Sequence, residues 1–211
     1  MENSESETYK IVKNFITKEE SENILDWVEG LSSTGLNANY HLTEITKVLN
    51  GNSFMFDISQ TKETSYITNY QKRDYVRTEG IPNFIFELID RISKKIGIQK
   101  NHLFLQAVNM EKGGKIAPHY DASIDGLINY KCNLSVLSED YSLFTDKFEI
   151  PVKQFDLYCF EASLYKHWTN EFNSRRVFLS FGFLLKYEDL GRDINDPRVR
   201  LSKRIAKYFQ K

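Results

Sequence analysis

The chain has 211 residues, 41% of them hydrophobic and 27% charged, with a formal net charge of −1 at pH 7. This composition is typical of a globular protein with a substantial core, and the near-neutral charge gives no overall field that would attract nucleic acid or anionic membranes. The acidic N-terminus is unlike a secretory signal, and no apolar run is long enough to span a bilayer. Cys132 and Cys159 lack metal-site spacing and are read as reduced core residues, so we expect a cytoplasmic protein without membrane contact.

Two amphipathic helices are predicted in the first half of the chain. The first follows a strand-like stretch at residues 9–15 and begins with the capping box T-K-E-E at residues 17–20. Its apolar positions recur at helical spacing as far as Leu31. The second is predicted to have Pro82 as its first residue and to end at Gly97. Its expected buried stripe consists of Ile85, Leu88, Ile89, Ile92 and Ile96.

Eight short strand-like segments, separated by turn residues, follow from residue 102. They cover residues 102–110, 115–121, 129–137, 142–146, 147–152, 155–161, 165–171 and 175–186. Short strands at such intervals indicate a sandwich or barrel rather than βαβ units. We therefore expect a mainly β fold with flanking helices (α+β). The tail from Asp196 should return to helix, with Leu201, Ile205 and Tyr208 as its apolar face.

The stretch K-I-A-P-H-Y-D, which ends at residue 121, carries a candidate metal site. Alternate residues of a strand point to the same face, so His119 and Asp121 should project together into the barrel. The candidates for a third ligand are the remaining histidines, His41, His102 and His167. Two imidazoles and one carboxylate leave open positions on a metal ion, which is the ligand set of non-haem Fe(II) oxygen chemistry.

A candidate anion site lies in the last strand-like segment, S-R-R-V-F-L-S-F-G-F. Arg176 and Ser180 share one strand face, and a buried arginine needs an anionic partner. A dicarboxylate cosubstrate would supply that partner through a bidentate pair, and Ser180 or Tyr130 could add a hydroxyl group. Arg175 is the alternative to Arg176. Asn133 could either line the site or form hydrogen bonds within the core.

Together these motifs resemble the Fe(II)/2-oxoglutarate-dependent dioxygenases, in their AlkB-like and prolyl-hydroxylase-like branch. H-Y-D is followed 48 residues later by a lone histidine, and an arginine nine residues further on leads into V-F-L-S-F. Gly113 lies where this superfamily usually has a glycine before the metal-binding strand. The main match covers roughly residues 100–186, and residues 11–27 also resemble the N-terminal strand and helix of both types.

The resemblance implies a double-stranded β-helix (jelly-roll, cupin-like) core. It implies a single domain made of an N-terminal part (1–100), the core (101–186) and a helical extension (187–211). Fe(II) would be held by His119, Asp121 and His167, while His41 and His102 are read as surface or core residues. The cosubstrate 2-oxoglutarate would be held by Arg176, Ser180, Tyr130 and Asn133, and O2 would be the other cosubstrate. A substrate lid, for which a solvated loop is the alternative, would be formed by Tyr66, Tyr70 and Tyr75.

The implied function is hydroxylation of an unactivated C–H bond of a small molecule, amino acid or peptide side chain, with succinate and CO2 as co-products. One alternative is AlkB-like oxidative demethylation of nucleic acid, and another is a catalytically silent metal-binding β-barrel that serves as an interaction module. AlkB-type demethylases usually have a second arginine six residues after the first, and commonly a tyrosine where this chain has Met110. The arginine position here is Gly182, counting from Arg176, or Phe181, counting from Arg175, which weakens the demethylase reading.

Overall fold

The computed structural model describes residues 8–31, 36–37, 51–57, 76–77, 80–98, 103–121, 123, 127–193, 195–201 and 203 of the chain. Its elements in chain order are β1 (Tyr9–Val12), α1 (Lys18–Gly30), β2 (Leu36–Asn37), β3 (Gly51–Asp57), β4 (Val76–Arg77), α3 (Asn83–Ile96), β5 (Leu103–Met110), β6 (Leu127–Leu137), β7 (Tyr141–Thr145), β8 (Glu149–Val152), β9 (Leu157–Glu161), β10 (His167–Thr169), β11 (Arg176–Lys186) and the 3-10 helix η3 (Glu188–Leu190). None of the helices within these ranges is both long and apolar enough to cross a membrane.

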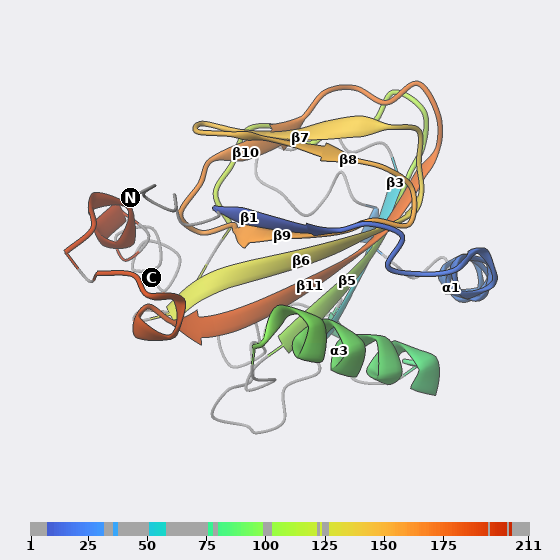
Figure 1. Cartoon of the computed structure of the whole chain (residues 1–211). Coiled ribbons are helices and arrows are strands. Elements are labelled where there is room, and N and C mark those ends of the chain that lie inside the picture. The colour runs from blue at the N-terminus through green and yellow to red at the C-terminus, as the bar shows by residue number, and fades with distance from the viewer. Residues whose placement is uncertain are drawn as a thin grey trace.

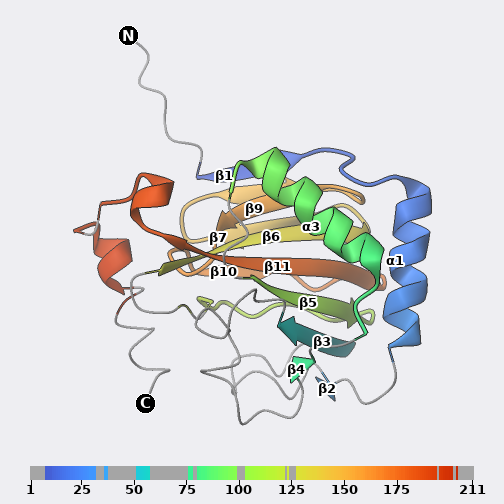
Figure 2. The same cartoon turned by 90° about the horizontal axis from the view of Figure 1, so that it is seen from below.

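Two sheets lie one over the other and form the body of the molecule (Figure 1). The large sheet has the order β1-β9-β6-β11-β5-β3-β2 with antiparallel neighbours, and β4 joins β3 in parallel. The small sheet has the antiparallel order β10-β7-β8. Figure 1 shows α3 on the side of the large sheet that faces away from the small one, and Figure 2 shows α3 crossing the strands with α1 at their end. The predicted mainly β fold with flanking helices is confirmed.

Both predicted helices form close to their expected bounds. The capping box of α1 is present, since the Thr17 hydroxyl accepts a hydrogen bond from the Glu20 amide (3.1 Å) and the Glu20 carboxylate accepts one from the Thr17 amide (2.8 Å). Pro82 is the residue that precedes α3 rather than its first helical residue. The helix ends at Gly97, whose φ of 81° is readily adopted by glycine. The predicted apolar stripe of α3 is buried and packs against the large sheet.

The strand β11 turns alternate side chains to opposite faces of the large sheet. On one face of β11, side chains that include Val177, Leu179 and Phe181 belong to the main apolar cluster beneath the helices. The side chains of the other parity are Arg176, Phe178 and Ser180. Phe178 packs with Phe172, and Tyr141 of β7 in the small sheet packs against the same cluster. This second face therefore lies in the interior between the two sheets.

The strand predicted at residues 115–121 is not formed as a regular strand. Only His119 takes part in a β-bridge, and its partner is His167 of β10. A short irregular pairing surrounds this bridge, in which the amide of Thr169 donates to the carbonyl of Ile116 (3.1 Å). The regular ladder stops after one pair, since this bond from Thr169 goes to Ile116 where a continuous register would use Ala117. The segment nevertheless lies beside β10, which places His119 next to His167.

The C-terminal tail differs from its predicted packing. Residues 197–201 are helical, as expected, but Leu201 is 39% exposed, so it is not on a buried face. Val199 is buried instead and joins an apolar cluster with Tyr165 and Tyr187. Ile205 and Tyr208 lie outside the described residues.

Candidate metal centre

The three residues predicted as metal ligands converge in the interior. One nitrogen or oxygen atom from each of His119, Asp121 and His167 lies within 4.8 Å of the others. Asp121 Oδ1 is 3.2 Å from Nε2 of His119 and 3.8 Å from Nε2 of His167. The two imidazole rings lie with their centroids 4.3 Å apart. The sequence prediction of these residues as one cluster is therefore supported by their geometry.

Backbone hydrogen bonds fix the positions of the three residues. The amide of His119 donates to the carbonyl of His167 (3.1 Å), and the amide of His167 donates back to the carbonyl of His119 (2.9 Å). The amide of Asp121 donates to the carbonyl of Ala162 (3.1 Å), next to the end of β9. Each ligand thus belongs to a backbone that is paired with another segment, which keeps the donor atoms together.

The ring nitrogens of both histidines are oriented for metal binding. Nδ1 of His119 lies 2.8 Å from the carbonyl of Ala117, and Nδ1 of His167 lies 3.0 Å from that of Tyr165. A carbonyl can only accept, so Nδ1 carries the proton and Nε2 of each neutral ring keeps a lone pair. Hydrogen bonding through the other ring nitrogen is how proteins orient histidine ligands. Both lone pairs face Asp121 Oδ1, an arrangement that suits a shared cation.

The charges at the site match the ligand states that a metal ion requires. Burial, with a smaller contribution from the neighbouring His119, lowers the pKa of His167 to about 3, although Asp121 opposes this shift. Burial raises the pKa of Asp121, but the ammonium of Lys131 and the neighbouring imidazoles outweigh burial and hold the pKa well below its usual range. The imidazole is therefore neutral and the carboxylate ionised at neutral pH. Two imidazole nitrogens and one carboxylate oxygen fit Fe(II), with the remaining positions open.

Arg176 is fully buried without an anionic partner among the described residues. Its Nη2 donates to the hydroxyls of Tyr141 and Tyr158, the latter at 3.3 Å. The rings that surround its guanidinium carbon at 4.1–4.7 Å are those of Tyr141, Phe172 and Phe178. Nε and Nη1 have no hydrogen-bond partner within the part of the chain that the structure describes. A buried guanidinium group with two nitrogens that lack hydrogen-bond partners is strongly disfavoured unless an anion binds it.

Arg176 and the metal ligands face the same interior. Arg176 contacts the hydroxyl of Tyr158, while the ring of Phe160 packs against His167 with centroids 5.0 Å apart. Tyr158 and Phe160 are alternate residues of β9, so their side chains share a face and lie about 7 Å apart along the strand. A small dicarboxylate could therefore reach from the guanidinium toward the three donors.

The choice between the two adjacent arginines is made by the strand parity. Arg175 points away from the interior. On that outer side its Nε donates to Asn109 (2.9 Å) and its Nη1 pairs with Glu29 of α1 (2.8 Å). Arg176 faces inward on the same side as Ser180. Of the two, only Arg176 is placed to hold an interior anion.

The other predicted cosubstrate residues divide between the two faces. Ser180 and Asn133 are paired across β11 and β6, both are buried, and neither Ser180 Oγ nor Asn133 Oδ1 has a partner among the described residues. Tyr130 lies on the opposite face, in the apolar cluster beneath the helices. Its expected role in cosubstrate binding is therefore wrong, because it is three residues from Asn133 and has the other parity. Tyr66, Tyr70 and Tyr75, the predicted lid, lie outside the described residues, as do His41 and His102.

Three residues at the site were missed by the sequence reasoning. Tyr141 and Tyr158 contact Arg176 from different sheets, and no local pattern marks them. Lys131 of β6 lies with its Nζ 2.6 Å from Oδ2 of Asp121. Its even spacing from Asn133 was a usable signal, since residues two apart on a strand share a face.

The position of Gly182 leaves no room for a side chain. A Cβ built there would lie 1.9 Å from Cε1 of Phe104, which is paired opposite on β5. The aromatic ring thus excludes any side chain larger than that of glycine at position 182.

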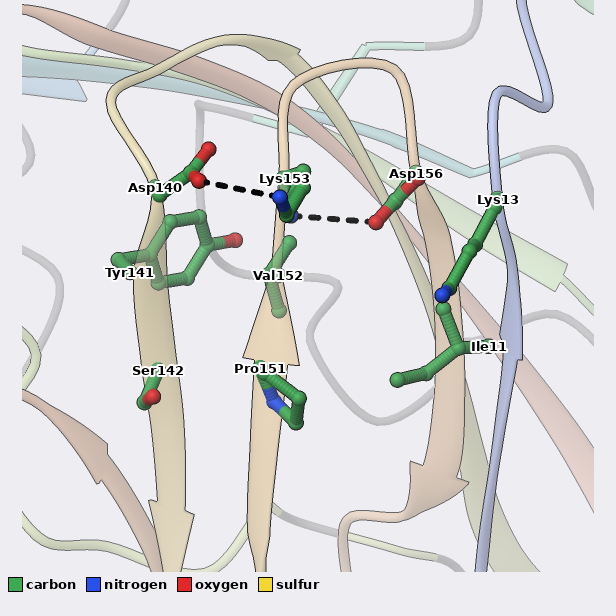
Figure 3. Close-up of a pocket in the computed structure, with 9 residues that line it drawn as sticks. All are labelled: Ile11, Lys13, Asp140, Tyr141, Ser142, Pro151, Val152, Lys153 and Asp156. Carbon is green, nitrogen blue, oxygen red and sulfur yellow. Dashed lines mark hydrogen bonds and ion pairs between the residues drawn. The ribbon is translucent and has the colours of Figure 1, made fainter.

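A separate surface cavity of about 350 Å³ lies between β1 and β8, at the edges of the two sheets (Figure 3). Its polar lining includes Asp140 and Lys153, which form an exposed ion pair (3.5 Å). The metal ligands do not line it. Tyr141 does, so its ring separates this cavity from Arg176.

Comparison with known proteins shows the fold. No family model matches the sequence, and no curated protein matches it significantly. The viral collagen prolyl hydroxylase of Paramecium bursaria Chlorella virus-1, in complex with 2OG, is similar with a TM-score of 0.53 and 12% identity, over 87% of this chain and 99% of that chain. An oxidoreductase of the 2OG-Fe(II) oxygenase family from Burkholderia pseudomallei has a TM-score of 0.56 and 10% identity, over 83% of both chains.

OsALKBH1 is also similar, with a TM-score of 0.58 and 11% identity, over 83% of this chain and 98% of that chain. At such low identities the likeness establishes a shared fold, and function has to be argued from the site. The predicted double-stranded β-helix core and the predicted structural resemblance to these oxygenases are confirmed.

Proposed function

We propose that this chain is an Fe(II)- and 2-oxoglutarate-dependent dioxygenase that hydroxylates an unactivated C–H bond of a small molecule, amino acid or peptide side chain. The observation that carries the proposal is the combination of two features on one interior face. His119, Asp121 and His167 bring their donor atoms together, and the fully buried Arg176 has no anionic partner among the residues that the structure describes. The shared fold with 2OG-Fe(II) oxygenases supports this reading.

The protein residues would bind and orient the reactants. Nε2 of both histidines and Oδ1 of Asp121 would hold Fe(II), while Arg176, with the hydroxyls of Tyr141 and Tyr158, would bind the remote carboxylate of 2-oxoglutarate. When bound, Fe(II) and 2-oxoglutarate supply the oxidation of the substrate by O2, with succinate and CO2 as co-products.

The residues around this anion site would exclude water and complete its hydrogen bonds. Met110, Val108, Phe172 and Phe178 form an apolar cluster on the interior face, so charges there interact in a dry environment. The free hydroxyl of Ser180 could donate a hydrogen bond to the bound cosubstrate, whereas Asn133 could do so only through its amide nitrogen.

Hydroxylation is favoured over demethylation of nucleic acid by two observations. Gly182, six residues after Arg176 where AlkB-type enzymes usually have a second arginine, has no room for a side chain beside Phe104. The chain also has a net charge of −1, which gives no general attraction to phosphate.

The proposal is tested with anaerobic protein, Fe(II) and 2-oxoglutarate. A weak visible charge-transfer band of the chelate should appear, and admission of O2 should release succinate. Asp121→Ala should lose both signals because it removes a ligand. Asp140→Ala, which removes an exposed carboxylate from a surface ion pair, is the matched control and should keep both.

A colourless wild-type protein without turnover would instead support the catalytically silent barrel. The type of reaction is read by mass spectrometry of candidate amino acids, peptides and methylated oligonucleotides. An added oxygen atom is the expected product, and a lost methyl group would favour the demethylase.

A further inference from the structure

Lys131 makes a contact in the candidate metal centre that metal binding by the three ligands does not itself explain. Its Nζ lies 2.6 Å from Oδ2 of Asp121, and the two side chains are only 13% and 12% exposed. Oδ1 of the same carboxylate faces the two imidazole nitrogens at 3.2 and 3.8 Å. The two oxygens of Asp121 therefore have separate neighbours, a cation on one side and the candidate metal position on the other.

The position of Lys131 follows from the sheet. Lys131 on β6 is paired directly across from Gly182 on β11. Gly182 has no side chain, and Phe104 closes that space, since a Cβ there would lie 1.9 Å from its ring. Because position 182 has no side chain, Lys131 is the member of this pair that extends into the interior.

A lysine in this position limits how the carboxylate can bind a metal ion. A carboxylate can coordinate through one oxygen or through both. The ammonium group forms a close ion pair with Oδ2, so a metal ion at that oxygen would meet a like charge, whereas Oδ1 remains accessible to it. The positive charge also repels a nearby divalent cation and so weakens its affinity.

Resting on the proposed metal site, we infer that Lys131 is a positioning residue that holds Asp121 to coordination through Oδ1 alone. In this way it keeps a coordination position open for the cosubstrate. Asp121 acts as the ligand, and Lys131 acts through it without contacting the metal.

The inference is tested by titrating metal-free protein with Co(II) under anaerobic conditions and recording its visible spectrum and Kd. In Lys131→Met the carboxylate is free to bind through both oxygens. The coordination number then rises, so the visible bands should weaken and shift. The Kd for Co(II) should fall by about tenfold, because a positive charge that repels the cation is removed.

Two variants serve as controls for this titration. Lys131→Arg keeps a cationic donor and should restore the wild-type spectrum and Kd. Lys153→Met breaks an exposed Lys–Asp pair away from the centre and should change neither.

The outcomes separate this inference from the proposed function. If wild-type protein binds Co(II) but Lys131→Met has the same spectrum and Kd, the positioning role is overturned while the metal site stands. If wild-type protein does not bind Co(II), both fall. Should Lys131→Met fail to fold, Lys131→Gln keeps a donor without the charge. It should retain the spectrum and lower the Kd, and an unchanged Kd in this variant would overturn the electrostatic role.

Discussion

The two faces of the large sheet are built from the same strands but have opposite character. The face beneath α1 and α3 carries an apolar cluster that includes Val177, Leu179 and Phe181. The face toward the small sheet carries Arg176 and Ser180, whose buried polar atoms include some without partners among the described residues. Neighbouring residues on β11 thus lie in different environments, one apolar and one with buried polar atoms that lack hydrogen-bond partners.

This difference indicates that one face of the strand stabilises the fold and the other face binds a ligand. Apolar side chains removed from water stabilise the fold, whereas a buried polar group without a partner destabilises it. The polar groups of the interior face therefore lower the stability of the free protein, and a bound anion would supply their missing partners. The following predictions test whether ligand binding and fold stability depend on opposite faces of the sheet, beginning with the largest expected effect.

Arg176→Met should separate binding from stability. Its Kd for 2-oxoglutarate, measured by calorimetry on anaerobic metal-loaded protein, should rise by about 30-fold or more, since removing one partner of a buried charge pair costs about 2 kcal/mol or more. The free energy of unfolding without cosubstrate should stay the same or increase, because an unpaired buried charge is removed. Arg175→Met, which alters the neighbouring surface arginine, is the matched control and should leave the Kd unchanged. Equal effects of both variants would contradict the assignment.

Leu179→Ala should show the opposite result. Leu179 is fully buried beneath the helices, so truncation should lower the free energy of unfolding in urea by about 2–5 kcal/mol. The cosubstrate Kd of the folded protein should not change. Leu201→Ala, at a position that is 39% exposed, should alter stability by about 0.5 kcal/mol or less. A large change of Kd in Leu179→Ala would show that the two faces are not independent.

The metal-free protein should lose stability in acid because of His167. Its pKa in the folded protein, about 3, lies below its ordinary value of 6.5, so the unfolded chain takes up a proton that the folded chain does not. Stability therefore falls as the pH drops from above 6.5 toward 3. Between about pH 7 and about pH 5 the loss from His167 should be about 2 kcal/mol. Urea unfolding should show a correspondingly flatter pH dependence for His167→Gln, and parallel curves would rule out this contribution.

Sequence periodicity was sufficient for the parts of the site that depend on a single strand. The parity of Arg176 and Ser180 identified the inward arginine. His119 and Asp121 project together although their segment forms only a bridge, because extended backbone alternates in the same way without a full ladder. The same rule could have excluded Tyr130, which has the other parity from Asn133.

Contacts between strands could not be predicted in this way. Tyr141 reaches Arg176 from the small sheet and Tyr158 reaches it from β9, so both depend on how the two sheets stack. Lys131 was missed for a different reason, since a lysine in a strand normally marks a solvent-facing position. The register that places it beside Asp121 and opposite Gly182 shows the interior position that its spacing from Asn133 already allowed.

The reciprocal amide bonds between His119 and His167 have a consequence for the thermodynamics of chelation. The chain between these residues is already closed into a loop by its own backbone, so an arriving ion does not have to bring the ends together. The conformational entropy of loop closure, which normally opposes binding between distant segments, is lost during folding. Stripping the ion with a chelator should accordingly leave amide exchange in this bridge slow.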